Sequence, residues 1–235
     1  MRKLISLVFI SLILVVYSCQ KDELTEPTSV DLEFSMDSYT CNGDGGAKSG
    51  TSFEMTEGTM IVESIEFDGR RDAGEDYFFT SNFSEPLIAQ MHIQQTNQNV
   101  SYDIPQGVYN RIELNFSIGD GNEDALCLQG KYQRGPLDEI EIRFEYSFKE
   151  QIRVRARNNK DEEQIVLKSN ADLKAKVIFD VPHFFQFVNM NMIKNAEVIQ
   201  VEGKDLILIN SNSNINIFNV LVPKLDNSIR VIFDE

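Results

Sequence analysis

The sequence has no tryptophan and only two histidines in 235 residues. Neither His92 nor His183 has a second histidine at the spacing of a metal site, and neither accompanies a nucleophile-elbow motif. We therefore expect a protein that is not an enzyme, with no catalytic residues, no metal and no cofactor. A hydrolase that uses paired carboxylates is a remote alternative, because 37 acidic residues make such pairs inevitable.

Positive charge is also scarce. Lysine and arginine number 22 against 37 aspartates and glutamates, and the formal net charge is −15. An acidic chain repels phosphate backbones, so this balance argues against nucleic acid as a partner and against peripheral binding to anionic lipid. One acidic segment, DGNED, places Asp120, Asn122 and Asp124 at alternate positions, as in a calcium loop. Ala125 and Lys131 stand where such a loop needs glycine and glutamate, so we predict a surface turn there.

No apolar run is long enough to span a bilayer, which takes about 20 helical residues. Residues 4–16 form a shorter apolar stretch behind Arg2 and Lys3, which is typical of a secretory signal peptide. The stretch ends at Val16-Tyr17-Ser18-Cys19, and this segment resembles the lipobox of bacterial lipoproteins. The resemblance implies that residues 1–18 are a cleaved signal and that Cys19 carries the lipid. An uncleaved anchor helix, or a secreted protein with an incidental cysteine, is the alternative.

The residues after Cys19 refine this localisation. The segment CQKDE is similar to the signal on surface-exposed lipoproteins of the Bacteroidota, which implies the outer membrane and favours its outer face. Gln20 also differs from the aspartate that retains lipoproteins in the inner membrane of enteric bacteria. We expect the lipid on Cys19 to hold the protein on the membrane, residues 19–31 to form a flexible polar tether, and residues 32–235 to form the folded domain.

Two further cysteines remain, Cys41 and Cys127. The expected compartment is oxidising, so they are candidates for a disulfide, which in the chain-entropy model would stabilise the fold by about 4 kcal/mol. The alternative is a buried free thiol at Cys127, which lies in the strand-like segment ALCLQG. Spacing alone does not decide between them.

Apolar residues alternate with polar ones along much of the chain, which predicts half-buried β-strands. The clearest cases are VYNRIELNFSI at residues 108–118 and EIEIRFEYSF at residues 139–148. Every apolar position in residues 140–156 is even-numbered, which predicts one long strand bent near Glu150 or a hairpin with an odd-numbered loop. A three-residue loop would place Glu145 opposite Arg155. Further strands are expected at residues 60–67, 77–80, 87–94, 100–104, 125–132, 164–168, 173–179, 197–201, 206–209 and 229–233.

Two later segments predict helices. In DVPHFFQFVNMNMIKN, Asp180 is placed to cap a helix that has Pro182 in its first turn. In NSNINIFNVLVPKLDN, apolar residues share one helical face until Pro223, which must kink or end the helix. The predicted fold is therefore mainly β, an antiparallel β-sandwich with two late helices, in which residues 180–235 are a candidate for a small α/β subdomain.

Three segments, TMIVESIEFDG, YDIPQGVYNRIELNF and LCLQGKY, together resemble a family of bacterial lipoprotein domains of unknown function. Members carry a Leu-Pro-x-Gly-x-Tyr-like turn that leads into a long strand, matched here by residues 104–109 with isoleucine in the first position. The resemblance implies a β-sandwich and brings no catalytic residues.

The functional expectation is an accessory lipoprotein of the cell envelope that binds a glycan or a protein partner. The side chains of Arg153, Arg155 and Arg157 are weak candidates for binding an anion, and a solvated strand face neutralised by nearby acids is the favoured interpretation of this row. A binding module should show a concave patch with exposed aromatic residues. The alternative function, a structural or adhesive subunit of a surface assembly, would need an uncovered strand edge.

Overall fold

The computed structural model describes residues 26–43, 51–93, 95–96, 99–168 and 173–234. The predicted signal peptide, Cys19 and the first part of the tether lie outside the described residues. The described chain is mainly β with a few short helices late in the sequence, as predicted. None of its helices is both long and apolar enough to cross a membrane.

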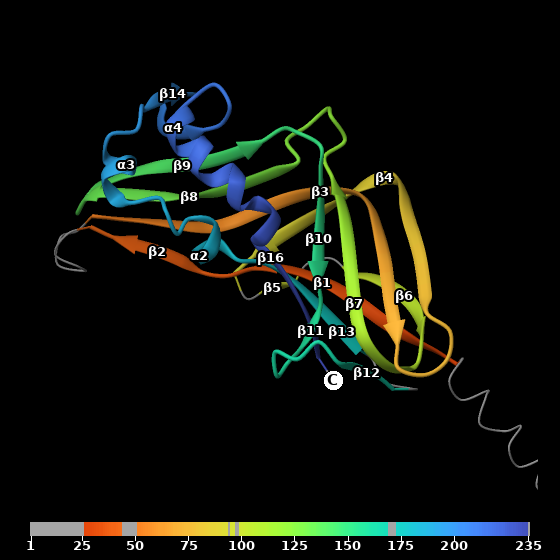
Figure 1. The fold of residues 1–235 in the computed structure, drawn as a ribbon. Helices are drawn as coiled ribbons and strands as arrows, with labels where there is room; N and C mark the ends of the chain where they lie inside the picture. The colour runs from red at the N-terminus through yellow and green to blue at the C-terminus, as the bar shows by residue number, and fades with distance from the viewer. Residues whose placement is uncertain (1–25, 44–50, 94, 97–98, 169–172, 235) are drawn as a thin grey trace, which may run out of the picture.

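The smaller sheet has five strands in the order β11-β16-β13-β1-β6 (Figure 1). Its strands β1 and β13 pair in parallel, and so do β11 and β16, whereas the other two pairings are antiparallel. The strand bounds are β1 (Pro27–Met36), β6 (Asn99–Pro105), β11 (Arg157–Asn158), β13 (Leu173–Phe179) and β16 (Ile229–Asp234).

The larger sheet follows the order β10-β7-β3-β8-β9-β15-β14, with β12 added to β7, β2 and β4 added to β3, and β5 added to β4. Its central strand β3 is 20 residues long. The bounds are β2 (Tyr39–Asn42), β3 (Ser52–Arg71), β4 (Tyr77–His92), β5 (Gln95–Thr96), β7 (Gly107–Ile118), β8 (Leu126–Gly135), β9 (Asp138–Tyr146), β10 (Glu150–Arg155), β12 (Ile165–Leu167), β14 (Ile199–Val201) and β15 (Lys204–Ile209).

The larger sheet has two halves that share β3. Residues 62–71 of β3 pair with β7, residues 52–60 pair with β8, and the register shifts between Val62 and Ser64, where the halves meet. Figure 1 shows β3 curving from one half into the other. A β-bulge bends a strand and increases its twist, which accounts for the curve at this position.

The even-numbered apolar pattern of residues 140–156 proves to be one bent strand. The pairing of β9 with β8 and of β10 with β7 places the two segments in line along the two halves of the sheet. Residues 147–149 form the break between them. The hairpin alternative is wrong, and Arg155 lies opposite Glu113 on β7 instead of Glu145.

Each half of the larger sheet is covered by a different layer. The half with β4, β3, β7 and β10 faces the smaller sheet, and the rings of Phe34 on β1 and Phe116 on β7 meet there at 6.4 Å. Helices cover the other half, where Phe144 on β9 contacts Phe184 at 5.1 Å and Phe53 on β3 contacts Phe185 at 5.6 Å. The buried residues of both halves form one continuous core.

The first predicted helix is divided into α2 (Val181–Phe184) and α3 (Met190–Lys194). Asp180 caps α2 as expected, because its carboxylate accepts a hydrogen bond from the backbone N–H of His183 at 2.9 Å. The extended residue Asn189 then caps α3 through the N–H of Met192, so a second helix starts where one continuous helix was expected.

The second predicted helix ends near Pro223, as expected. Helix α4 (Ile215–Leu221) gives way to the 3₁₀ helix η2 (Val222–Asn227), which contains this proline. Phe218, Leu221 and Leu225 of these two helices are buried against the sheet half that the helices cover.

The structure differs from the predicted architecture in three details. The sheets are mixed, because β9 pairs with β15 in parallel in addition to the two parallel pairs of the smaller sheet. Residues from 180 onward complete both sheets, since β14 and β15 join the larger one and β16 joins the smaller one. The expected tether reached residue 31, but β1 begins at Pro27 and buries Val30 completely, so residues 27–31 belong to the sheet.

The turn in IPQGVY carries the chain from β6 in the smaller sheet to β7 in the larger one. The hydroxyl of buried Tyr109 donates to the carbonyl of Pro105 at 2.7 Å, and the guanidinium of Arg71 donates to the carbonyl of Gln106 at 2.7 Å. Gly107 adopts φ of 141°, a conformation that favours glycine. These contacts hold β7 in place beside β3.

Candidate functional site

The outward-facing side chains of β4, β3, β7 and β10 form two rows across four adjacent strands. The rows arise because the register places one residue of each strand beside the next, while the intervening residues point into the core. In the order of the four strands, the first row is Thr80, Glu66, Asn115 and Arg153, and the second row is Phe78, Asp68, Glu113 and Arg155. We call these eight residues the outer-face rows.

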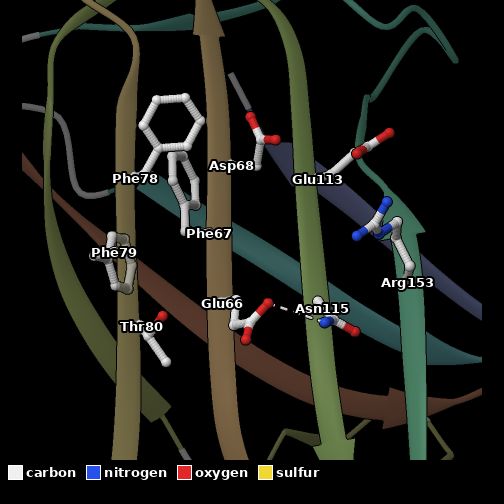
Figure 2. A pocket seen from close by; sticks show the side chains of 9 residues that line it. All are labelled: Glu66, Phe67, Asp68, Phe78, Phe79, Thr80, Glu113, Asn115 and Arg153. Atoms are coloured by element: carbon white, nitrogen blue, oxygen red, sulfur yellow. Dashed lines mark hydrogen bonds between the residues drawn. The ribbon is translucent and has the colours of Figure 1, made fainter.

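A hollow of about 390 Å³ lies over the rows. It is lined by seven of the eight outer-face residues together with Phe67 and Phe79. Figure 2 shows Glu66 and Asn115 joined by a hydrogen bond, with Arg153 on the β10 side of them and Phe78 on the β4 side. The hollow is an open, concave surface that combines one exposed aromatic ring with several polar groups, as small-ligand sites do.

Two carboxylates of the second row are neutralised by arginines. Asp68 lies 3.0 Å from the guanidinium of Arg70 and 3.6 Å from that of Arg111, and Glu113 lies 3.1 Å from that of Arg155. Arg70 also donates to Asp76 at 2.9 Å, and this hydrogen bond lowers the pKa of the Asp76 carboxyl. These pairs fix the charged side chains around the hollow.

Two charges of the first row have no ionic partner within the part of the chain that the structure describes. Among the described residues, the Glu66 carboxylate accepts a hydrogen bond from the Asn115 amide at 3.0 Å and forms no ion pair, and the Arg153 guanidinium forms neither an ion pair nor a hydrogen bond. The two residues flank Asn115 on neighbouring strands, so their Cα atoms are about 10 Å apart by strand spacing. The first row therefore presents one negative and one positive group to a ligand.

The aromatic member of the rows is exposed. Phe78 has 52 % of its surface accessible, although large apolar side chains usually lie inside. The Arg70 guanidinium lies over its ring, 4.6 Å from the centroid, and holds one side of the ring in place. The rest of the ring is available as an apolar platform beside the polar row.

Only one of the three arginines predicted as anion candidates contributes an unpaired charge. Arg155 pairs with Glu113 and with Glu163 at 3.3 Å, and Arg157 lies 3.5 Å from Asp161. The expectation of a neutralised face is confirmed for these two, whereas Arg153 lines the hollow. Sequence reasoning missed Glu66, Asn115 and Phe78, because only the register between strands brings them together.

The other residues singled out in the sequence lie elsewhere. His92 on β4 is 3.9 Å from Glu57, and no group of three or more metal-binding side chains gathers anywhere in the described residues. The predicted surface turn at DGNED is confirmed, because Asp120 accepts hydrogen bonds from the backbone N–H groups of Asn122 and Glu123 at 2.8 and 3.1 Å. The hydrogen bond from Asn122 contributes most, and together these bonds lower the pKa of the Asp120 carboxyl to about 2.

Of the two alternatives left open for Cys41 and Cys127, the disulfide does not form, because both cysteines are free. Cys41 lies opposite Phe53 and Cys127 lies opposite Thr59, on different sides of β3 and roughly 20 Å apart by the rise of the strand. Bridged cysteines have Cα atoms within about 7 Å of each other. The alternative of a free Cys127 holds, although the side chain is half-buried, and this burial raises the pKa of its thiol to about 11.

No protein-family model, curated protein or solved structure matches the chain.

Proposed function

We propose that the protein is a non-enzymatic, lipid-anchored protein of the cell envelope that binds a glycan in the hollow over the outer-face rows. The observation that carries the proposal is the exposed ring of Phe78 beside the polar groups of Glu66, Asn115 and Arg153, all in the same hollow. A sugar has an apolar face of C–H groups and a rim of hydroxyls. It therefore suits an aromatic platform next to hydrogen-bonding side chains.

The membrane part of the proposal depends on the sequence around Cys19. Each buried CH₂ of an acyl chain contributes about 0.8 kcal/mol to membrane binding, so two or three chains anchor a protein durably. Strand β1 starts eight residues after Cys19, at Pro27, and eight extended residues span at most about 28 Å. The anchor would therefore keep the folded domain close to the membrane surface.

Mass spectrometry of the native protein tests the anchor. We expect a chain that begins at Cys19 and carries a diacylglyceryl group on the thiol, and we expect a Cys19→Ala variant to leave the membrane fraction. An intact Met1 or an unmodified Cys19 in the native protein would refute this part of the proposal. Protease treatment of intact cells tests the outer face, and resistance until the cells are lysed would exclude it.

A glycan array followed by titration calorimetry tests the binding site, with the full chain purified in detergent. We expect Phe78→Ala to weaken glycan binding at least tenfold, because the variant removes the platform and leaves the polar groups. Phe187→Ala is the matched control, since Phe187 is also exposed and lies between α2 and α3 on the other layer. Equal binding by the Phe78 and Phe187 variants would place the site elsewhere.

The alternative function is an assembly subunit that accepts a partner strand along β4. This strand is 16 residues long and, among the described strands, pairs only with β3 and with the two-residue β5, so most of its other edge has no strand beside it. Strand β14, at one end of the larger sheet, is a weaker candidate because it is only three residues long, and short strands limit pairing at a sheet edge.

A further inference from the structure

We infer that the ligand of the outer-face rows is an acidic oligosaccharide, whose carboxylate pairs with Arg153 while another sugar ring lies against Phe78. This inference rests on the proposed glycan-binding function and names the class of glycan. It depends on three observations: the unpaired charge of Arg153, the position of this charge among the groups that line the hollow, and the distance between the two ends of the site.

Arg153 is a cation without a counter-ion in the described structure, at the edge of a hollow. The neighbouring Arg155, on the same strand, has two carboxylate partners. The guanidinium is planar and can donate two parallel hydrogen bonds to a carboxylate, which makes it the side chain best suited to this group. A ligand carboxylate would supply the partner that the protein does not.

The charges around the hollow indicate where an acidic group would fit. The lining holds one cation, Arg153, and three carboxylates, those of Glu66, Asp68 and Glu113. Asp68 pairs with Arg70 and Arg111, and Glu113 pairs with Arg155, so arginines already neutralise two of these carboxylates. Arg153 keeps its charge available, so a ligand carboxylate is best placed on the β10 side of the hollow.

The unpaired carboxylate of Glu66 does not oppose this orientation. It belongs to β3, two strands from Arg153, a separation close to the distance over which salt screens charges, about 8–10 Å. Glu66 is already hydrogen-bonded to Asn115, and its oxygens can accept further hydrogen bonds from sugar hydroxyls. The acidic group therefore lies best over β10, with hydroxyls over β3 and β7.

The distance between Arg153 and Phe78 sets the size of the ligand. The two residues lie on β10 and β4, three strand spacings apart and offset by two residues along the strands, so their Cα atoms are about 16 Å apart. One sugar ring is too small to reach both, so the ligand is a disaccharide or longer, with the uronic acid over β10.

Calorimetry with a panel of uronic-acid trisaccharides and their carboxyl-reduced forms tests the inference on the full chain in detergent. We expect at least one acidic trisaccharide to bind about tenfold or more tightly than its reduced form. Arg153→Ala should weaken binding of the acidic form much more than binding of the reduced form and so remove this difference, and Arg153→Lys should restore part of it. Arg134→Ala is the matched control, because it removes the same charge from an exposed residue on β8 outside the hollow.

The outcomes separate the inference from the proposed function. Equal binding of acidic and reduced forms, or a preference that survives Arg153→Ala, would overturn the inference and leave glycan binding intact if Phe78 still matters. Loss of the preference in the Arg134 control would also overturn it, because net charge alone would then explain the effect. Absence of binding to every acidic and neutral glycan would refute the proposed function itself.

Discussion

Replacing Gly130 with alanine should destabilise the protein more than any other glycine-to-alanine change on β8. Gly130 lies where the register of β3 against β8 shifts between Met55 and Glu57. A Cβ atom at this position would sit 2.0 Å from the carbonyl oxygen of Glu54 and 2.8 Å from the Cα of Met55. Both are backbone atoms, so no side chain can rotate away, and β3 or β8 must move.

The expected cost is about 3 kcal/mol, the upper part of the range measured when atoms are forced into a packed interior. Urea unfolding of the full chain should show this as a midpoint lower by about 1 M, for an m-value near 3 kcal/mol per M. Gly135→Ala on the same strand is the matched control, because no atom lies within 4 Å of its added Cβ. If the free energies of unfolding of the two variants differ by less than about 0.5 kcal/mol, the close approach of β3 to β8 at Gly130 is refuted.

Three further predictions concern polar groups that are wholly or partly buried. Tyr109→Phe should lower the free energy of unfolding by about 1–2 kcal/mol in the same urea experiment, since it leaves the Pro105 carbonyl without its partner, and an unchanged midpoint would contradict this. Alkylation of Cys127, followed by mass spectrometry, should be slow at neutral pH and accelerate toward pH 11, because burial raises the pKa of its thiol to about 11. Rapid labelling of the folded protein at neutral pH would contradict this prediction. Burial raises the pKa of three tyrosines, Tyr39, Tyr109 and Tyr146, from about 10 in the unfolded chain to about 12 in the folded protein. The stability that they contribute is therefore fully present below pH 10 and is lost as the pH rises toward 12. Phenolate absorbance and circular dichroism, recorded together, should show these tyrosines ionising as the fold is lost, and ionisation near pH 10 in the folded state would refute it.

Local patterns predicted the strands well because burial on one face leaves a mark in the sequence. The even-numbered apolar positions of residues 140–156 indicated a bent strand, and β9 and β10 are its two parts. The same signal was present in β1, where Val30, Leu32, Phe34 and Met36 alternate and are buried. The polar start of this strand makes residues 27–31 resemble a tether, because the alternation begins only at Val30.

Pairing between distant strands could not be predicted in the same way. Strand β13 lies parallel to β1, and Leu173 is opposite Val30, but neither segment contains a signal for the other. The separation of Cys41 and Cys127 has the same cause, because the sequence does not show on which side of β3 each strand lies.

The candidate site depends on such pairing even more than the fold does. The alternation in VYNRIELNFSI showed that Glu113 and Asn115 face outward, and the arginine row was recognised as an outward face. Only the register of β3, β7 and β10 brings Glu66, Asn115 and Arg153 into one row. The hollow is therefore a property of the assembled sheet.

This dependence on alignment limits how the surface can diversify during evolution. Inserting or deleting one residue within β7 would turn Glu113 and Asn115 into the interior and push Leu114 into water, which would damage the fold and the ligand surface together. Single replacements at outward positions change only what a ligand meets. Descendants of this protein should thus acquire new preferences by exchanging side chains in the rows, while length variation accumulates in the connecting loops.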